Sequence, residues 1–174
     1  KGYPPGIREN GGQYTHAACW AVQAVAVHGD HNRALRLWEM LTPISHSRTP
    51  EAAELYKVEP YAVAADIYGA EPHVGRGGWT WYTGSAGWMY RLMVESLLGL
   101  QREGDRLRLA PCIPHDWPEY SLRYRYRDSV YRIRVRQLES GDTSRLTVDG
   151  VAQDGLVIPL QDDRGEHVVE AWVA

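Results

Sequence analysis

Two segments of the chain collect the side chains that could do chemistry, and each lies directly before an apolar helical pattern. The first spans residues 1–16 and is rich in glycine. It carries four side chains that can form paired hydrogen bonds with hydroxyl groups: Arg8, Glu9, Asn10 and Gln13. Gly11 and Gly12 would let a ligand approach the backbone closely. These residues predict a binding loop for a ligand with hydroxyl groups, and a helix-capping loop with Thr15 near the cap accounts for them equally well.

The second segment spans residues 75–88, a glycine-rich loop that runs into a helix. The first backbone N–H groups of a helix have no partner within it, and the helix dipole adds partial positive charge there. Together with the hydroxyl of Thr83 and the backbone near Gly84, they predict an anion site that suits phosphate. The alternative is structural: Thr83 caps the helix, and Trp79 and Trp81 anchor the loop by packing.

A histidine pair and an arginine ladder are weaker candidates for a site. His28 and His31 lie three residues apart, but no further Cys, His or acid nearby completes a metal-ligand set, so we expect no metal. Arginines alternate along residues 123–127 and 132–136, which is typical of the solvent-facing side of a half-buried sheet. The sequence lacks the strings of serine hydrolases, zinc proteases and P-loop proteins.

Composition excludes several classes of protein. The 174 residues are 44% hydrophobic with a formal net charge of -3, so the chain can bury a core but has no basic excess for nucleic acid. No apolar run reaches the roughly 20 residues that span a bilayer. Cys19 and Cys112 form no disulfide framework, which favours a reducing cytoplasm. Seven Trp and eleven Tyr, with no Phe, suit sugar faces and ordinary cores alike.

The hydrophobic pattern changes its period along the chain. Helical spacing predicts four helices before residue 104, over residues 14–28, 32–41, 59–68 and 83–101. A period of two then predicts a β-hairpin that turns near Asp128 and Ser129. Four further short strands are expected over residues 106–109, 145–148, 155–158 and 167–173. We therefore predict an α+β chain, with helices over residues 1–104 and a small antiparallel β-sandwich or jelly-roll-like domain over residues 105–174.

The predicted helices are apolar on more than one side, yet only about two helical hairpins are there to cover them. One explanation is that a larger helical assembly continues before Lys1. The other is that the chain associates with a second copy through an exposed apolar patch, as a homodimer. Either way, the sequence predicts that these helices have partners.

Three strings occur in a fixed order: RENGGQYTH at residues 8–16, EPYAVAAD at residues 59–66 and GGWTWYTGSAGW at residues 77–88. They resemble glycoside hydrolase family ninety-four, the inverting phosphorylases of cellobiose, chitobiose and β-1,2-glucans. With LAPCIPHDWP at residues 109–118, nearly the whole chain is most similar to the C-terminal phosphorylase domain of the cyclic β-1,2-glucan synthases. The resemblance implies the last helices of an (α/α)6 toroid over residues 1–104, braced by the C-terminal β domain.

The resemblance also implies roles for both loops. A His at the position of His16 and a Thr-Gly pair at Thr83 and Gly84 hold phosphate in the family. Arg8 and Glu9 match a basic and acidic pair that grips the sugar next to the cleaved bond. The expected sugar-binding set is completed by Gln13 and Trp81. No cofactor is implied, because inorganic phosphate is the co-substrate.

Two positions depart from the cellobiose-type members. Those members place a phosphate-binding Gln where this chain has Ala64 and Ala65, and they usually carry Lys in place of Arg8. The exchange of Lys for Arg keeps the charge and changes its geometry. We hypothesise that Arg76, which lies in the loop before the phosphate-binding helix, replaces the missing phosphate contact.

The implied reaction explains which acids to expect. Inverting hydrolysis needs one carboxylic acid for the leaving group and a second carboxylate to activate water. Phosphorolysis needs only the first, because phosphate is the nucleophile. In the family this catalytic Asp lies upstream of the segment that matches residues 1–6. We therefore expect no catalytic residue on this chain, and the chain alone should be inactive.

The implied function is transfer of a glucosyl unit from a β-glucan, with a β-1,2 linkage favoured, to phosphate, giving α-glucose 1-phosphate. The expected partners are the glucan, phosphate and the remaining N-terminal part of the enzyme. Cyclic glucan synthases are large inner-membrane proteins, so the resemblance implies a cytoplasmic domain whose parent is anchored in the bacterial inner membrane. The alternative is a non-catalytic carbohydrate-binding or structural module in which Trp79, Trp81 and Trp117 stack on sugars.

Overall fold

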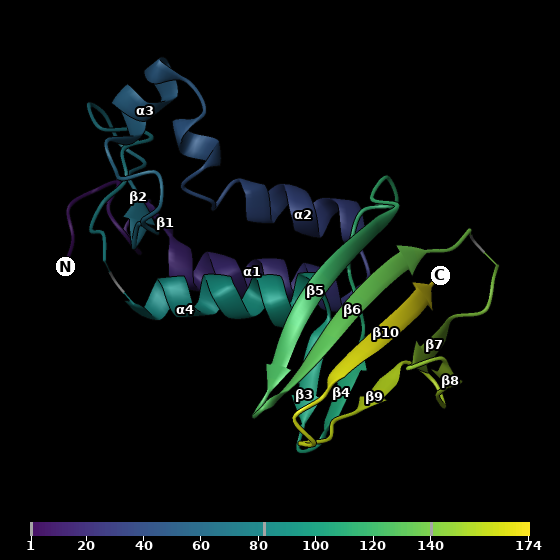
Figure 1. Cartoon of the computed structure of the whole chain (residues 1–174). Coiled ribbons are helices and arrows are strands. Elements are labelled where there is room, and N and C mark those ends of the chain that lie inside the picture. Colours follow the sequence, from purple (N-terminus) through teal and green to yellow (C-terminus); the bar gives the residue numbers. More distant parts are fainter. Residues whose placement is uncertain (1, 82, 140) are drawn as a thin grey trace. The chain divides into compact units, whose positions relative to one another are not determined.

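The computed structural model describes residues 2–81, 83–139 and 141–174. Two compact units divide the chain between Met93 and Val94 (Figure 1). Helices dominate the first unit and strands the second, so the chain is α+β, as predicted. The change of sequence period at residue 104 lies inside the second unit.

The first predicted helical hairpin is confirmed. Along the first of its helices, Cys19 and Val22 face inward at helical spacing and form a buried cluster with Met89. Gly29 ends this helix with a left-handed φ of 78°. Asp30 then caps the next helix, because its side chain accepts a hydrogen bond from a backbone N–H in the first turn. The two helices are α1 (Thr15–Val27) and α2 (His31–Glu39).

The third helix differs from the prediction. The helix expected over residues 59–68 is wrong, because that range holds the short strand β2 (Asp66–Ile67). The helix lies earlier instead, as α3 (Pro50–Tyr56), after a single 3₁₀ turn, η1 (Ser45–Ser47). Thr49 caps α3, with Pro50 in its first turn, whereas the N–H of Ala65 donates to the carbonyl of Trp79 and not within a helix.

Strand β2 ties the first loop to the second. It pairs antiparallel with β1 (Gln13–Tyr14), directly before α1. The backbone N–H of Thr15 continues this contact by donating to the carbonyl of Ala65, 2.9 Å away. Segments that lie about fifty residues apart in the sequence are thereby held side by side (Figure 1).

The last helix of the first unit is shorter than predicted. Helix α4 (Thr83–Arg91) passes into a π-helical segment, η2 (Leu92–Leu97), which crosses the division between the units. The helix predicted up to residue 101 is therefore wrong in its last turn, where the strand β3 (Leu100–Glu103) begins. Gly99 makes this change of direction with a left-handed φ of 76°.

The second unit contains every strand that the sequence predicted, together with β3 and one further short strand. After β3 come β4 (Arg106–Leu109), β5 (Glu119–Tyr126), β6 (Ser129–Gln137), β7 (Arg145–Val148), β8 (Val151–Ala152), β9 (Val157–Pro159) and β10 (Glu166–Val173). They form one sheet in the order β5-β6-β10-β7-β8 and another in the order β3-β4-β9. The hairpin of β5 and β6 turns at Arg127 and Asp128.

The two sheets of the second unit share one core, as in a sandwich. Leu107 and Ile158 from the smaller sheet lie in the same buried cluster as Ile133, Leu146 and Val169 from the larger one. The strand pairs of the described residues are antiparallel except β6 with β10, which run parallel. The expected all-antiparallel sandwich is corrected at this pair, because the long connection between β6 and β10 permits a crossover.

Candidate functional site

The loops of the first unit are packed backbone against backbone. The N–H of Gly69 donates to the carbonyl of Gly6 at 2.8 Å, and the N–H of Gly12 donates to that of Arg8 at 2.9 Å. A side chain on Gly69 would overlap the carbonyl oxygen of Gly11. Glycine is therefore required here by close approach, and the two loops form one rigid platform.

Arg8 is held at the centre of this platform. Its backbone adopts a left-handed φ of 46°, and its N–H donates to Oδ2 of the buried Asp66 at 3.2 Å. The guanidinium lies over the ring of Trp79, with Cζ 4.4 Å from the ring centroid, and Nη1 donates to the hydroxyl of Tyr3 at 2.9 Å. The aromatic contacts fix the direction of the positive charge.

Two further predicted sugar contacts flank Arg8. The side chain of Glu9 is exposed, as a carboxylate that receives a ligand from solvent must be. Gln13 lies in β1, and its Nε2 is 3.4 Å from Oγ1 of Thr15, a long hydrogen bond. The structure thus places the three predicted polar residues on the one loop before α1.

His16 lies in the first turn of α1, inside an aromatic cluster. Its ring centroid is 4.7 Å from that of Trp20 and 5.6 Å from that of Trp88. Its Nε2 atom is buried and has no hydrogen-bond partner in the described ranges. Buried polar atoms almost always have a partner, and leaving one without costs about 1–3 kcal/mol. His16 therefore presents an unused hydrogen-bonding atom at the start of a helix.

The predicted phosphate-binding helix runs beside α1. Both helices begin at the same end of the unit, next to β1 and β2 (Figure 1), and Cys19 of α1 contacts Met89 of α4 at 4.0 Å between sulfurs. Gly84, in the first turn of α4, is exposed, and a Cβ added there would meet open space. The side chain of Thr83 lies outside the described residues. The N-termini of α1 and α4, which carry partial positive charge from the helix dipole, therefore lie together, and Gly84 leaves space there for an anion.

Arg76 lies in a different setting from His16 and Gly84. It is exposed and lines a hollow of 430 Å³ beside α3, together with Glu51, Glu54 and Lys57. The two carboxylates of this hollow balance its two cations, Lys57 and Arg76, so it offers a phosphate anion no excess of positive charge, and the structure gives no support to the predicted phosphate contact of Arg76. That role stays a prediction.

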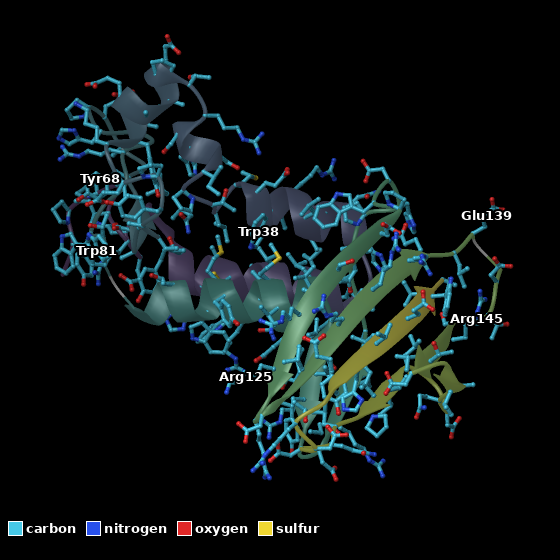
Figure 2. The ribbon with its side chains drawn as sticks, viewed as in Figure 1. Trp38, Tyr68, Trp81, Arg125, Glu139 and Arg145 are labelled. Carbon is cyan, nitrogen blue, oxygen red and sulfur yellow. The ribbon has the colours of Figure 1, made fainter. Side chains whose placement is uncertain are left out.

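Trp81 is more exposed than Trp38 and Trp88, the two indoles that pack against the helical core. Figure 2 shows it among the loops near β1 and β2, whereas Trp38 lies between α2 and α1. Trp81 is 69% exposed and has a left-handed φ of 63°. For a non-glycine residue such a backbone costs on the order of 1–3 kcal/mol. Its Nε1 donates to Oε1 of Glu59 at 3.3 Å.

Sequence reasoning missed two acidic residues of the site, Glu59 and Asp66. Asp66 is only 1% exposed, and the backbone of Gly78 packs so closely against its carboxylate that a side chain there would overlap it. The sequence did contain a signal for Asp66, because this residue directly follows the apolar residues 61–65. A carboxylate that is buried with such a segment needs a hydrogen-bond partner. Glu59 precedes a proline and gives no such signal.

The described residues hold no group of three or more His, Cys, Asp or Glu that could bind a metal ion. Cys19 is buried in the helical core, and this burial raises the pKa of its thiol to about 11. A thiol with such a pKa is protonated at neutral pH and is a poor nucleophile. In the part of the chain that the structure describes, no helix combines the length and apolar character needed to cross a membrane.

The first unit thus brings together a platform of two packed loops, an arginine that lies over aromatic rings, and the starts of two adjacent helices. Residues 1–99 match the family described as glycosyl hydrolase 94 superfamily, catalytic domain. Residues 100–150 match the C-terminal domain of glycosyl hydrolase family 65. The chain therefore belongs to glycosyl hydrolase family 94, as its three strings predicted.

Curated relatives agree with this assignment. The chain is 54% identical to the cyclic beta-(1,2)-glucan synthase NdvB of Rhizobium meliloti (strain 1021) over 82% of its length and 5% of that protein. It is 36% identical to solabiose phosphorylase of Paenibacillus borealis over 97% of its length and 22% of that protein. It is 29% identical to N,N'-diacetylchitobiose phosphorylase of Vibrio proteolyticus over 94% of its length and 20% of that protein. The chain thus spans a small part of each relative.

Proposed function

We propose that the protein carrying this chain is an inverting glycoside phosphorylase that cleaves a β-glucan with inorganic phosphate, and that this chain supplies phosphate and sugar contacts. Family membership and the phosphorylases among its relatives support the reaction class. The 54% identity to a cyclic beta-(1,2)-glucan synthase supports the β-1,2 linkage. The helices of the first unit would be the last ones of an (α/α)6 toroid.

The observation that carries the proposal is Nε2 of His16 at the start of α1, which is buried without a hydrogen-bond partner among the described residues, together with the open space at Gly84 in α4. Phosphate offers acceptor oxygens that would take a hydrogen bond from the imidazole and from backbone N–H groups in the first turn of α4. The positive ends of both helices would stabilise its charge. Arg76 is a further proposed contact, although its carboxylate neighbours oppose it.

In the proposed reaction, a phosphate oxygen attacks the anomeric carbon from the face opposite the leaving sugar. The bond to the glycosidic oxygen breaks, and a carboxylic acid outside these residues gives its proton to that oxygen. A β-glycoside is thereby converted to α-glucose 1-phosphate. Arg8, Glu9, Gln13 and Trp81 hold the sugar, and the phosphate pocket replaces the carboxylate base that a hydrolase needs.

Gly84 allows a sharp test, because its structural and ligand-binding roles predict opposite results. A methyl group at Gly84 meets open space and favours the helix, so Gly84→Ala should leave stability unchanged or raise it by about 0.5–1 kcal/mol. If phosphate approaches the backbone there, the same methyl should raise the KM for phosphate by about tenfold or more. Gly87→Ala, in the same helix and also facing open space, is the matched control.

The assay uses the longer protein that carries this chain, with a linear β-1,2-linked gluco-oligosaccharide and inorganic phosphate, and follows glucose 1-phosphate. We expect phosphate-dependent release, which His16→Ala abolishes and Gly87→Ala leaves intact. Release of free glucose without phosphate would overturn the proposal in favour of hydrolysis. A protein that binds the oligosaccharide but cleaves nothing would favour a non-catalytic carbohydrate-binding module, which the exposed Trp79 and Trp81 would suit.

A further inference from the structure

We propose that Glu59, Tyr61 and Trp81 form a sugar subsite, in which a glucosyl unit stacks on the indole of Trp81, Tyr61 forms a side wall and Glu59 is the positioning residue of the indole. The proposal rests on the proposed function, since it names the surface that takes the sugar chain next to the phosphate pocket. Neither Glu59 nor Tyr61 was among the residues that the sequence predicted.

The geometry of the three residues carries the inference. Tyr61 is 73% exposed and Trp81 is 69% exposed, and their ring centroids lie 6.1 Å apart with planes at 65°. The two aromatic rings thus form an open corner, in which a sugar ring can contact both of them. Large aromatic side chains that are this exposed and adjacent mark a binding surface.

Glu59 fixes the indole within this corner. The bond from Trp81 Nε1 to Glu59 Oε1 holds the ring in one orientation. A carboxylate accepts more hydrogen bonds than one indole supplies, so Glu59 can also receive a sugar hydroxyl at the edge of the stack. An aromatic face for the C–H groups of a sugar, with a carboxylate beside it for the hydroxyls, matches both surfaces of a β-linked glucosyl unit.

The backbone of Trp81 is a second, independent observation. A bulky residue with φ of 63° is an outlier, and such outliers cluster at ligand-binding sites, where the surroundings hold them in place. With this backbone the indole of Trp81 stays exposed to solvent. A tryptophan that only packed the loop would gain more from burial, as Trp38 does in the helical core.

The position of the corner in the chain relates it to the phosphate pocket. Trp81 and Gly84 are three residues apart, and three residues span at most about 11 Å. A sugar on Trp81 is therefore within one or two glucosyl units of an anion at Gly84. This separation suits a glucan whose end unit lies at the phosphate and whose next units lie along the loop.

The experiment measures the KM for a linear β-1,2-linked gluco-oligosaccharide, the KM for phosphate and kcat in the longer protein, for Trp81→Ala, Tyr61→Ala, Glu59→Ala and Glu59→Gln. Trp81→Ala should raise the oligosaccharide KM about tenfold, and Glu59→Ala about fivefold, with the phosphate KM unchanged. Glu59→Gln keeps an acceptor for the indole and should restore most of the loss. Tyr90→Ala removes an aromatic ring of equal exposure, 69%, on α4 and should change nothing.

Equilibrium binding of the same oligosaccharide without phosphate separates this inference from the proposed function. If no phosphorolysis occurs but the unaltered protein binds the oligosaccharide, and Trp81→Ala weakens binding about tenfold, the subsite stands and the proposed function falls. If phosphorolysis occurs while oligosaccharide KM and affinity stay unchanged in folded Trp81→Ala and Glu59→Ala proteins, the subsite is overturned. Equal losses for Glu59→Ala and Glu59→Gln would overturn the positioning role.

Discussion

The outer face of the five-stranded sheet and the loops of the first unit use polar side chains in opposite ways. On the sheet, Arg132 pairs with Glu166 at 2.9 Å and Arg134 with Glu119 at 2.6 Å, and the hydrogen bond from Arg134 lowers the pKa of that carboxyl. At the start of α1, directly after the first loop, Nε2 of His16 has no partner within the described ranges, although it is buried. Polar groups that satisfy one another stabilise a fold, whereas a buried polar atom without a partner lowers stability and leaves a hydrogen bond that a ligand could form.

Backbone regularity differs in the same way. The sheet holds its strands by ladders of eight aligned residue pairs between β6 and β10, whereas β1 and β2 share only two. The loops depend instead on glycines that admit another backbone and on single contacts such as that of Asp66 with Arg8. A site built in this way can present side chains in unusual directions, and it is more sensitive to the exact residues of its loops.

The largest expected effect tests the core of the second unit. Ile133 is 1% exposed in β6, so Ile133→Ala should remove about 3 kcal/mol of stability through lost burial and a cavity. Amide hydrogen exchange should speed up throughout the sandwich and much less in residues 2–70. The exposed Arg123, on the neighbouring strand, is the control, since Arg123→Ala should change stability by no more than about 0.5 kcal/mol. An equal increase in exchange rate in both units would show that they unfold together, and the sheet and the loops would then not differ in how they are stabilised.

The next effect tests the loops. A side chain on Gly69 overlaps the carbonyl of Gly11, so Gly69→Ala should cost about 2–3 kcal/mol locally and loosen both loops. Hydrogen exchange should rise over residues 6–15 and 65–70 and stay unchanged in β5 and β6. Gly87→Ala, in open helical space, should be neutral or slightly stabilising. Unchanged exchange near Gly69 would mean that the loops are not one platform.

The smallest effect concerns an ion cluster of the second unit. Nδ1 of His167 lies 2.8 Å from Asp149 Oδ2 and Nε2 lies 3.2 Å from Asp163 Oδ1, an arrangement that only the protonated imidazole satisfies at both nitrogens. The hydrogen bond with Asp149 first, and that with Asp163 next, raise the pKa of His167. The bond with His167 is the main cause that lowers the pKa of Asp149, whereas the pKa of Asp163 is lowered first by the N–H of Gly165, next by the hydroxyl of Ser129 and then by His167.

The sign of the pH dependence follows from these shifts. The raised pKa of His167 contributes stability that is fully present below the pKa of the unfolded state and is lost as the pH rises through the pKa of the folded state. The lowered pKa values of Asp149 and Asp163 act in the opposite sense. Their contribution is lost as the pH falls through the folded-state pKa values of these carboxyls. His167→Gln should therefore cost on the order of 1 kcal/mol near pH 5.5 and less near pH 9. Thermal unfolding across this range measures it, with the exposed His28→Gln as control. A pH-independent loss would leave His167 a packing residue, stacked on Tyr131.

Much of the fold was predictable because the spacing of apolar residues along the sequence shows which face of a helix or strand is buried. Alternation along residues 123–127 and 132–136 predicted β5, β6 and the solvent-facing arginines, and apolar spacing predicted α1 and α2. The predictions that failed have local causes. The string of alanines in residues 59–68 has a helical composition, but its backbone groups are taken by β1 and by the loop after it, as in the bond from Ala65 to the carbonyl of Trp79.

The candidate site remains a prediction as to the roles of its residues, but the structure shows how these residues are arranged. The sequence by itself determined the family, the polar loop with Arg8 and Glu9, and His16 and Gly84 at helix starts, because residue types and glycine spacing are local properties. Only the tertiary structure decided that α1 and α4 begin side by side, that Asp66 is buried under Arg8 and that Glu59 orients Trp81. These contacts join segments about twenty to seventy residues apart, and no periodicity within either segment encodes which backbone will lie against it.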